Sequence, residues 1–328
     1  MQATTAGSGA AQQSGSVSRR IGPYVLLTPL DDPYSGVPVP ERRYIARSTD
    51  GERTVLLSAP LAGTDPQRFM MEAEGSRYLL GQVMSPAVTC AAPEEPAWHA
   101  RPYLPALPLP TALAVHGGPL PERTVRALGA ALAEALAIVH GQGLAYAGVS
   151  PAAVLFAADG PRLSCFGAVR AAAPDGTVRS GMPGLEPGSL PPEQASGGHP
   201  RPPGDVYALG ATLAYAATGH TTPERDDLPA PLRTIVSRCL SRDAAARPQL
   251  AELIDAFAPA EATSSAAPGP IGPAMAAMPA DVGFATRVAG LLSPGWLPSR
   301  VIAAIAHQSA AVLAADIPGV GASIPRQD

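Results

Sequence analysis

The sequence has few of the residues that mark metal sites, disulfide scaffolds and nucleic-acid binding. Its three cysteines, Cys90, Cys165 and Cys239, lie far apart and show no metal-ligand spacing, which favours a reducing compartment over secretion. The six histidines form no cluster along the chain, so we expect no metal site. A net charge of −4 gives no reason to expect nucleic acid or an anionic membrane as a partner. We therefore expect a cytoplasmic protein.

Long apolar runs are also missing from two stretches of the chain. Residues 1–20 are rich in Gly, Ser, Ala and Gln without an apolar core, which predicts a disordered leader rather than a signal peptide. Residues 259–280 are mostly Ala, Pro, Ser and Gly, a composition typical of a linker. In contrast, 46% of all residues are hydrophobic, which is enough to bury a sizeable core elsewhere.

A tail at residues 281–328 follows the linker and contains one helical pattern, at residues 298–315. The residues that recur at helical spacing are Val301, Ile302, Ile305, Ser309, Val312 and Leu313. This segment has about 18 residues and includes Arg300 and His307, so it is short and too polar for a confident membrane span. Docking on the rest of the chain, docking on a partner and membrane contact all remain open.

The chain is organised around the stretch from Gly143 to Gly167. Before this stretch, residues 121–140 carry apolar side chains three or four positions apart, which predicts an amphipathic helix. Within it, residues 154–156 and 161–164 are predicted to pair as a hairpin, because Asp159-Gly160 is a strong turn signal. The predicted order is therefore helix, loop and hairpin.

This arrangement resembles the catalytic loop and hairpin of eukaryotic-like bacterial Ser/Thr protein kinases. In that family the loop carries His-Arg-Asp, then Lys-Pro, then Asn, and the hairpin ends in Asp-Phe-Gly. The matching positions here are Tyr146-Ala147-Gly148, Ser150-Pro151, Ala153 and Cys165-Phe166-Gly167. The resemblance implies a two-lobed α+β kinase-like fold, with a β-rich small lobe at residues 21–104 and a helical large lobe at 105–258, followed by the helical tail.

The family's reactive side chains are absent at these positions. Gly148 offers no carboxylate to orient and deprotonate a substrate hydroxyl. Ala153 and Cys165 replace the magnesium-binding Asn and Asp, and a hard cation prefers oxygen ligands. Ser150 and Ser58 replace lysines that the family places near phosphate. We therefore expect no catalytic residue and no metal or other cofactor, although ATP without magnesium is possible.

In the small lobe, the segment that matches the glycine-rich loop has changed in composition. Residues 30–40 contain one glycine, three prolines and the acids Asp31 and Asp32, a poor lining for phosphate. A helix is predicted over residues 65–80, with Phe69, Met70, Ala73 and Leu80 facing inward. On this helix, Glu72 matches the family's glutamate that pairs with the missing lysine.

The hinge between the lobes matches residues 102–105, so backbone groups at Tyr103 and Leu104 are candidates for adenine binding. Arg101 occupies the gatekeeper position. Its long side chain is predicted to fill the inner pocket or to reach a carboxylate such as Glu72. An alternative is that Arg101 points into solvent.

In the large lobe, the resemblance implies three residues with structural roles. Glu193 and Arg247 match an ion pair of the family, and Asp205 matches the acid that braces the catalytic-loop backbone. The activation segment, residues 168–190, contains possible phosphorylation sites. These are Thr177, Ser180 and Ser189.

Three hypotheses for function follow. The leading one is a catalytically inactive pseudokinase, not an enzyme, that acts as a regulatory or scaffolding module for a protein partner. The second is a divergent Ser/Thr kinase or other ATP-dependent transferase that uses displaced acids, for which Asp31, Asp32 and Asp159 are candidates. The third is a nucleotide-binding switch without turnover.

Overall fold

The computed structural model describes residues 19–258 and 288–315. The predicted leader at 1–20, apart from its last two residues, the linker at 259–280 and parts of the tail lie outside the described residues.

A six-stranded sheet in the order β1-β2-β3-β4-β6-β5 forms the small lobe. The strands are β1 (Arg20–Ile21), β2 (Tyr24–Pro29), β3 (Glu41–Ser48), β4 (Thr54–Pro60), β5 (Thr89–Cys90) and β6 (His99–Pro102). Because successive side chains of a strand point to opposite faces, the neighbours Ile45 and Ala46 enter different apolar clusters. One face of the sheet therefore packs on Trp98, and the other is directed toward the large lobe.

Helix α1 (Pro66–Ser76) lies against the sheet and begins as the sequence predicts. The side chain of Asp65 accepts hydrogen bonds from the backbone N–H groups of Gln67 and Arg68, which caps the helix. The prediction that the helix continues to Leu80 is wrong. It ends at Ser76, and the side chain of Leu80 is 61% exposed rather than inward-facing.

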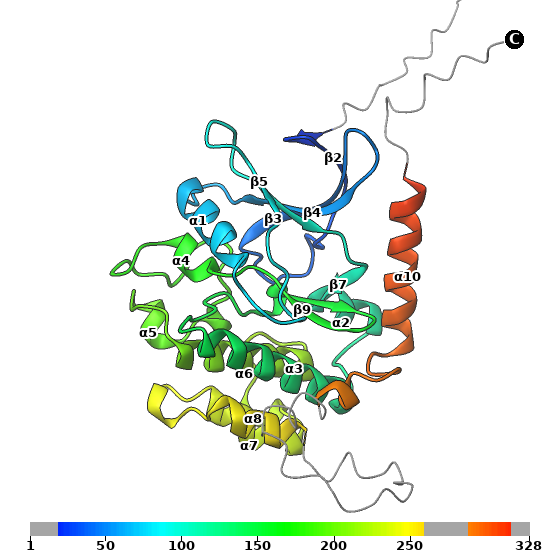
Figure 1. The fold of residues 1–328 in the computed structure, drawn as a ribbon. Helices are drawn as coiled ribbons and strands as arrows, with labels where there is room; N and C mark the ends of the chain where they lie inside the picture. The colour runs from blue at the N-terminus through cyan, green and yellow to red at the C-terminus, as the bar shows by residue number, and fades with distance from the viewer. Residues whose placement is uncertain (1–18, 259–287, 316–328) are drawn as a thin grey trace, which may run out of the picture.

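The large lobe surrounds α3 (Glu122–Gly141), as Figure 1 shows. The other helices are α2 (Leu109–His116), α4 (Ala168–Ala172), α5 (Pro192–Ala195), α6 (Pro202–Thr218), α7 (Ala230–Cys239) and α8 (Leu250–Phe257). A three-stranded sheet of β7 (Ala106–Pro108), β8 (Val154–Ala157) and β9 (Gly160–Leu163) contains the predicted hairpin. Leu128, Leu132 and Leu136 are fully buried, as the periodicity of the predicted helix requires. The expected two-lobed α+β fold is confirmed.

Among the described residues, α3 alone is long and apolar enough to cross a membrane by composition. Two thirds of its most apolar stretch is buried inside the large lobe, so this helix is accounted for as the centre of the core.

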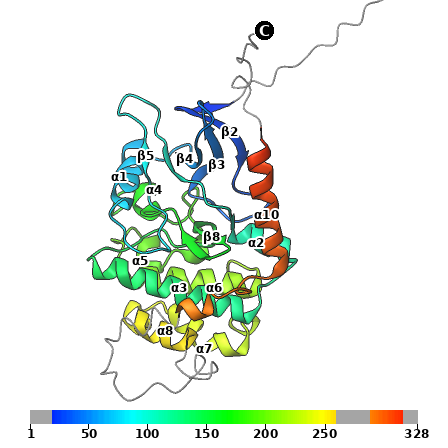
Figure 2. The same cartoon turned by 45° about the vertical axis from the view of Figure 1, so that its right-hand side comes forward.

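The tail helix α10 (Ser299–Ala314) lies along both lobes on one side of the molecule, as Figures 1 and 2 show. Trp296 and Val301 belong to the apolar core of the large lobe. At the other end of the helix, Val312 belongs to an apolar cluster that joins side chains of both lobes, among them Ile45 and Leu155. The Arg47 side chain of the small lobe donates hydrogen bonds to the carbonyls of Val312 and Ala315. The predicted helix is present, but Leu313 is exposed rather than on its buried face.

Candidate functional site between the lobes

Asp205, at the start of α6, holds the loop that matches the kinase catalytic loop. Its carboxylate accepts hydrogen bonds from the backbone N–H groups of Tyr146 (2.7 Å) and Ala147 (2.8 Å). His140 contacts the same carboxylate at 2.9 Å. Asp205 is almost fully buried, so these bonds replace its lost contacts with water. The loop backbone is thus fixed in the way that the resemblance implies.

Gly148, at the position of the family's catalytic aspartate, has no room for a side chain. A Cβ atom built on Gly148 would lie 1.9 Å from the carbonyl oxygen of Cys165. The loops also share a hydrogen bond from the Val169 N–H to the Ala147 oxygen (2.9 Å). Glycine at 148 is therefore part of a close backbone contact, a role that the sequence did not reveal.

Ala153 and Cys165, at the magnesium-ligand positions, are both buried. The carbonyl of Ala153 accepts from the N–H and the hydroxyl of Ser164, each at 2.9 Å. Burial and the nearby negative charge of Glu41 raise the pKa of the Cys165 thiol to about 12. Cys165 is therefore a neutral thiol at physiological pH.

Arg43 on β3 crosses from the small lobe to the catalytic loop and was missed by the sequence analysis. Its guanidinium donates to the Ala152 carbonyl (2.8 Å), to the Ser164 hydroxyl (3.0 Å) and to both carboxylate oxygens of Asp31. Burial alone would lower the pKa of Arg43, but the negative charge of Asp31 and its hydrogen bond raise it, and the net shift is upward. One signal was available, because Glu41, Arg43 and Ile45 alternate along one strand and share its face.

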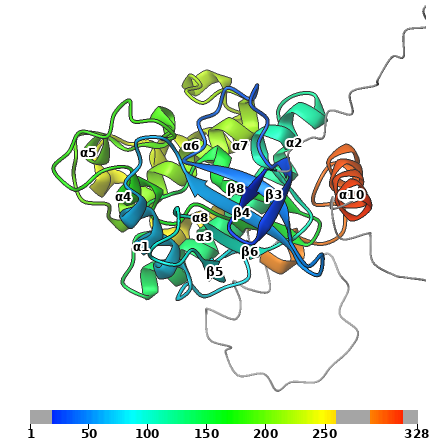
Figure 3. The same cartoon turned by 90° about the horizontal axis from the view of Figure 1, so that it is seen from above.

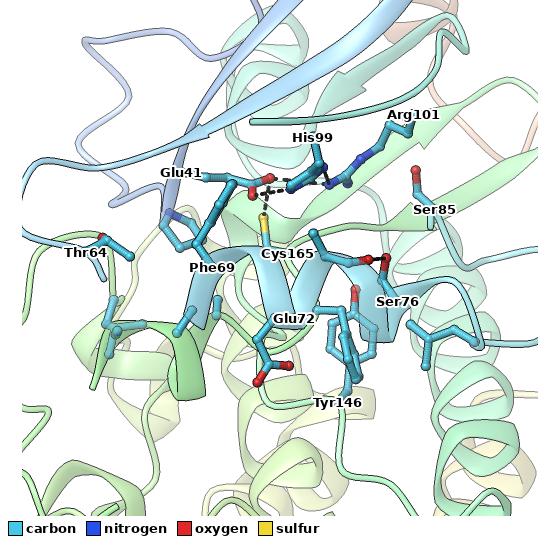
Figure 4. A pocket seen from close by; sticks show the side chains of 18 of the residues that line it. Glu41, Thr64, Phe69, Glu72, Ser76, Ser85, His99, Arg101, Tyr146 and Cys165 are labelled. Carbon is cyan, nitrogen blue, oxygen red and sulfur yellow. Dashed lines mark hydrogen bonds and ion pairs between the residues drawn. The ribbon is translucent and has the colours of Figure 1, made fainter. Parts of the chain in front are cut away.

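A second cluster of charged groups surrounds Glu41, as Figure 4 shows. The Ser58 hydroxyl donates to Glu41 Oε1 (3.0 Å), and His99 Nε2 lies 3.4 Å from Glu41 Oε2. Arg101 Nη2 lies 3.6 Å from Glu41 Oε1. Burial would raise the pKa of Glu41, but the hydrogen bond from His99 and the charges of Arg101 and Arg43 lower it overall. Glu41 is therefore ionised although it is buried.

Arg101 points inward, as predicted, but its partner is Glu41 and not Glu72. It lines a cavity of about 30 Å³ between the lobes, together with Glu41, Glu72, His99 and Cys165. A cavity of this volume has space for about one water molecule. Much of the inner pocket is thus filled by protein side chains.

Glu72 on α1 pairs with Arg170 in the first turns of the activation segment, and Figure 4 shows it pointing away from Arg101. Two hydrogen bonds join the side chains, at 2.8 Å and 2.7 Å. The Arg170 guanidinium also lies 4.8 Å from the centre of the Phe166 ring and donates to the Ala145 carbonyl (3.0 Å). Glu72 therefore ties α1 to the activation segment.

The hinge groups Tyr103 and Leu104 lie beside apolar side chains from both lobes. Leu30, Ile45 and Leu56 of the small lobe form one buried cluster with Leu155 of β8, and the two hinge residues pack against it. The N–H of Tyr103 donates to the Thr54 carbonyl (3.3 Å). Of the two predicted adenine-binding groups, the Tyr103 N–H is therefore already in use.

Glu193 and Arg247 form a bidentate ion pair, with Nη1 to Oε1 at 2.6 Å and Nη2 to Oε2 at 2.9 Å.

Of the candidate phosphorylation sites, Thr177 and Ser180 are exposed. Ser189 is buried, so its hydroxyl is not accessible to another enzyme in this conformation.

The three candidate displaced acids lie in different surroundings. Asp31 is drawn between the lobes by Arg43. Asp32 accepts a hydrogen bond from the Tyr34 N–H in its own turn (2.9 Å). Asp159 pairs with Arg162 at the exposed hairpin tip. Of the three, Asp31 is the acid that the fold brings beside the catalytic loop.

The chain also lacks two residue types that the family uses between its lobes. All 23 basic residues of the sequence are arginine, and asparagine does not occur. No lysine or asparagine from elsewhere in these 328 residues replaces those missing from the motifs. Within the described ranges, no group of three His, Cys, Asp or Glu side chains could hold a metal ion.

Comparison with known proteins identifies the relatives of this chain. It is 32% identical over 256 residues to a probable Ser/Thr protein kinase, PkwA, of Thermomonospora curvata, over 72% of this chain and 34% of the relative. It is 30% identical over 263 residues to the Ser/Thr protein kinase AfsK of Streptomyces coelicolor, over 74% of this chain and 32% of the relative. The chain thus spans about a third of the length of these curated relatives.

Among solved structures, the chain resembles the crystal structure of a mutant form of the Mycobacterium tuberculosis PknI kinase domain. The TM-score is 0.56 at 21% identity, over 73% of this chain and 96% of that domain, which supports the fold alone. No family model matches the chain.

These relatives overturn two expectations. The expectation that the chain is not an enzyme is wrong, because its curated homologues at 30–32% identity are named Ser/Thr protein kinases, which points to an enzyme. The expectation that it has no cofactor is wrong for the same reason, since protein kinases use ATP together with Mg²⁺.

The side chains at the family's own metal positions do not fit Mg²⁺. Ala153 and the neutral thiol of Cys165 present no side-chain oxygen ligand. At the position of the catalytic acid, no side chain can be added to Gly148 without moving the Cys165 backbone. The nearby carboxylates Asp31 and Glu41 already contact arginine.

Proposed function

We propose that this homologue of bacterial Ser/Thr protein kinases is a divergent protein kinase domain. The observation that carries the proposal is that kinase relatives align over about three quarters of the chain, 72% and 74%, and that its catalytic-loop frame is held by Asp205. The groups that act on phosphate and on the substrate hydroxyl then differ from those at the family positions.

Arg43 is the candidate phosphate-contacting residue. Its guanidinium lies between the lobes, 2.8 Å from the Ala152 carbonyl and next to the Ala153 position. A guanidinium offers several N–H donors in a planar fork, which suits phosphate oxygens. Phosphate binding would require Arg43 to exchange part of its contact with Asp31 for the ligand.

Asp31 is the candidate acid for the substrate hydroxyl. Arg43 contacts both Asp31 and the catalytic loop, so if Arg43 turns to phosphate, the Asp31 carboxylate loses its partner and can accept a proton. A positioned carboxylate contributes roughly 10²–10⁴-fold when it acts as a general base.

The experiment incubates the purified chain with ATP labelled at its γ-phosphate, Mg²⁺ or Mn²⁺ and a generic protein substrate. We expect slow transfer, reduced at least about tenfold by Arg43→Gln because the phosphate contact is lost. Arg42→Gln is the control, since Arg42 lies next in the strand but is exposed. Thermal melts of both variants verify the fold. No transfer by the unsubstituted chain, or equal loss in both variants, contradicts the proposal.

A second candidate is a regulatory module that presents the kinase fold to a protein partner in the cytoplasm. It is favoured by the tight contact between Gly148 and Cys165 and by the neutral side chains at Ala153 and Cys165. Such a module could also act as a nucleotide-binding switch, because binding ATP needs fewer protein side chains than transferring its phosphate. Calorimetry with ATP, with Mg²⁺ and in EDTA, distinguishes the switch from a module that binds only protein. Heat of binding without transfer supports the switch, and no heat at millimolar ATP supports a purely protein-binding module.

A further inference from the structure

Residues 31–40, in the connection from β2 to β3, extend over helices of the large lobe when the molecule is seen from above (Figure 3). Val37 is 6% exposed and belongs to the apolar core cluster of the large lobe. Ser35, Gly36 and Val37 share a surface cavity of about 460 Å³ with residues of the large lobe that include Tyr215 and Thr221. This segment of the small lobe is therefore anchored in the large lobe.

The end of the segment lies over the catalytic loop and the activation segment. Pro40 lines a small cavity, about 20 Å³, together with Gly148, Ser150 and residues 184–186, 189 and 190. A Cβ atom built on Gly184 would lie 2.7 Å from Pro40 Cα and 2.9 Å from the Val39 oxygen. The two backbones thus approach closely enough that glycine is required at 184.

An ion pair joins the beginning of the segment to strand β3. Asp31 stands at its beginning and Arg43 three residues after its end, and buried Arg43 forms an ion pair with partly buried Asp31. Arg43 also donates to the Ala152 carbonyl of the large lobe (2.8 Å). Separating the pair would leave the buried charge of Arg43 uncompensated, so this contact resists opening.

The composition of the segment suits an extended occupant of a groove. Val37-Pro38-Val39-Pro40 alternates valine with proline, whose ring fixes φ near that of an extended chain and removes the N–H. Such a segment loses little conformational freedom when it is bound, and its valines supply apolar contact.

We propose that Val37–Pro40 is an internal occupant of the groove between the catalytic loop and residues 184–190, and that it closes this groove to other polypeptides. The groove opens when Val37 leaves the large-lobe core. The contact of this segment with the large lobe is seen in the structure. Its consequence, that the segment controls the access of protein substrates, rests on the proposed kinase function.

The test is hydrogen–deuterium exchange on the full chain carrying Val37→Asp, which places a charge in the apolar site. We expect amides of residues 146–150 and 184–190 to exchange at least about tenfold faster, because their cover is lost. Tyr34→Asp is the matched control in the same segment, since Tyr34 is 92% exposed. Its exchange should equal that of the unsubstituted chain.

A second variant, in which residues 37–40 become Gly-Ser-Gly-Ser, guards against a general loss of folding. Exchange in α8 must stay unchanged in both variants, because α8 lies at the end of the large lobe that is far from the small lobe (Figure 1). Unchanged exchange at residues 146–150 and 184–190 in this variant overturns the proposal.

Phosphate transfer by the same variants separates the two proposals. Faster exchange with faster transfer to a protein substrate supports both. Faster exchange without transfer keeps the internal occupant and counts against the kinase function. Transfer without faster exchange overturns the internal occupant alone.

Discussion

At the scale of single residues, Gly148 is where the catalytic loop and the Cys-Phe-Gly segment come closest. Because a Cβ atom there would meet the Cys165 oxygen at 1.9 Å, we expect Gly148→Ala to destabilise the fold by about 3 kcal/mol. Gly148→Asp should do the same rather than increase activity. Urea denaturation measures the change in the free energy of unfolding.

The control for this prediction is Gly141→Ala. Gly141 ends α3, and no atom lies within 4 Å of the place where its Cβ would stand. Alanine there should be neutral or stabilising by roughly 0.5–1 kcal/mol, because it reduces the freedom of the unfolded chain. Equal stability of the two variants, or faster phosphate transfer by Gly148→Asp, would show that the loops open readily.

His99 gives a residue-scale prediction for pH. Burial, the largest effect, and the positive charge of Arg101 lower its pKa below the ordinary 6.5, although Glu41 acts in the opposite direction. The folded chain therefore keeps His99 neutral while the unfolded chain binds a proton as the pH falls through 6.5. The contribution of neutral His99 to the free energy of unfolding is therefore complete above pH 6.5 and is lost progressively as the pH falls below it.

We expect the urea midpoint of the unsubstituted chain to fall more between pH 7.5 and 5.5 than that of His99→Gln, since glutamine binds no proton in this range. The other histidines contribute equally to the fall in urea midpoint of both proteins, so the difference between the two falls reports on His99. The charged groups that contact His99 are Arg101 and Glu41, and the lowered pKa of Glu41 keeps its carboxylate ionised over this range. An equal fall in both proteins would mean that His99 titrates normally.

At the scale of elements, local patterns were sufficient where the signal lies within one segment. The helix α3 and the β8–β9 hairpin were predicted because apolar spacing and an Asp-Gly turn need no knowledge of distant contacts. The beginning of β3 at Glu41 has no such local signal. Inward-facing charges at Glu41 and Arg43 lack the usual pattern of a strand with a buried apolar face.

The partners of these charges depend on strand register, which one sequence does not reveal. Residue 58 pairs with Arg43 on one side and His99 on the other, and Leu56 pairs with Arg101. This register brings Arg101 to Glu41, whereas Glu72 is on a helix whose partner, Arg170, comes from the activation segment. The missing kinase side chains were visible in the motifs, but the charged groups now between the lobes were not.

The tail helix illustrates the same limit. Its periodicity showed an apolar face and left open what covers that face. The structure places Trp296, just before the helix, against Phe156 of the large lobe, and Val312 in the apolar cluster that joins the two lobes. The Trp296 ring N–H also donates to the Ala158 carbonyl (3.0 Å).

At the scale of the whole molecule, several connections besides the hinge cross between the lobes. Arg43 reaches the Ala152 carbonyl, Val37 enters the large-lobe core, and α10 contacts both lobes. These contacts are made by separate parts of the chain, so the loss of one is felt by both lobes. We therefore expect a single cooperative unfolding transition by calorimetry.

The last prediction detaches the upper end of α10. Val312→Asp places a charge at a side chain that is 3% exposed, whereas Leu313→Asp, its neighbour, alters one that is 74% exposed. Loss of the buried valine and of the two Arg47 hydrogen bonds to this end of the helix should cost about 2 kcal/mol. Leu313→Asp should change stability by less than about 0.5 kcal/mol.

Calorimetry and hydrogen–deuterium exchange together distinguish where the cost of Val312→Asp falls. If α10 couples the lobes, exchange in β2 and β3 rises and an earlier unfolding transition separates from that of the large lobe, whose own contacts with Trp296 and Val301 remain. A lower but still single transition, with uniform faster exchange, would instead show that Arg43 and the Val37–Pro40 segment suffice to couple the lobes without the helix.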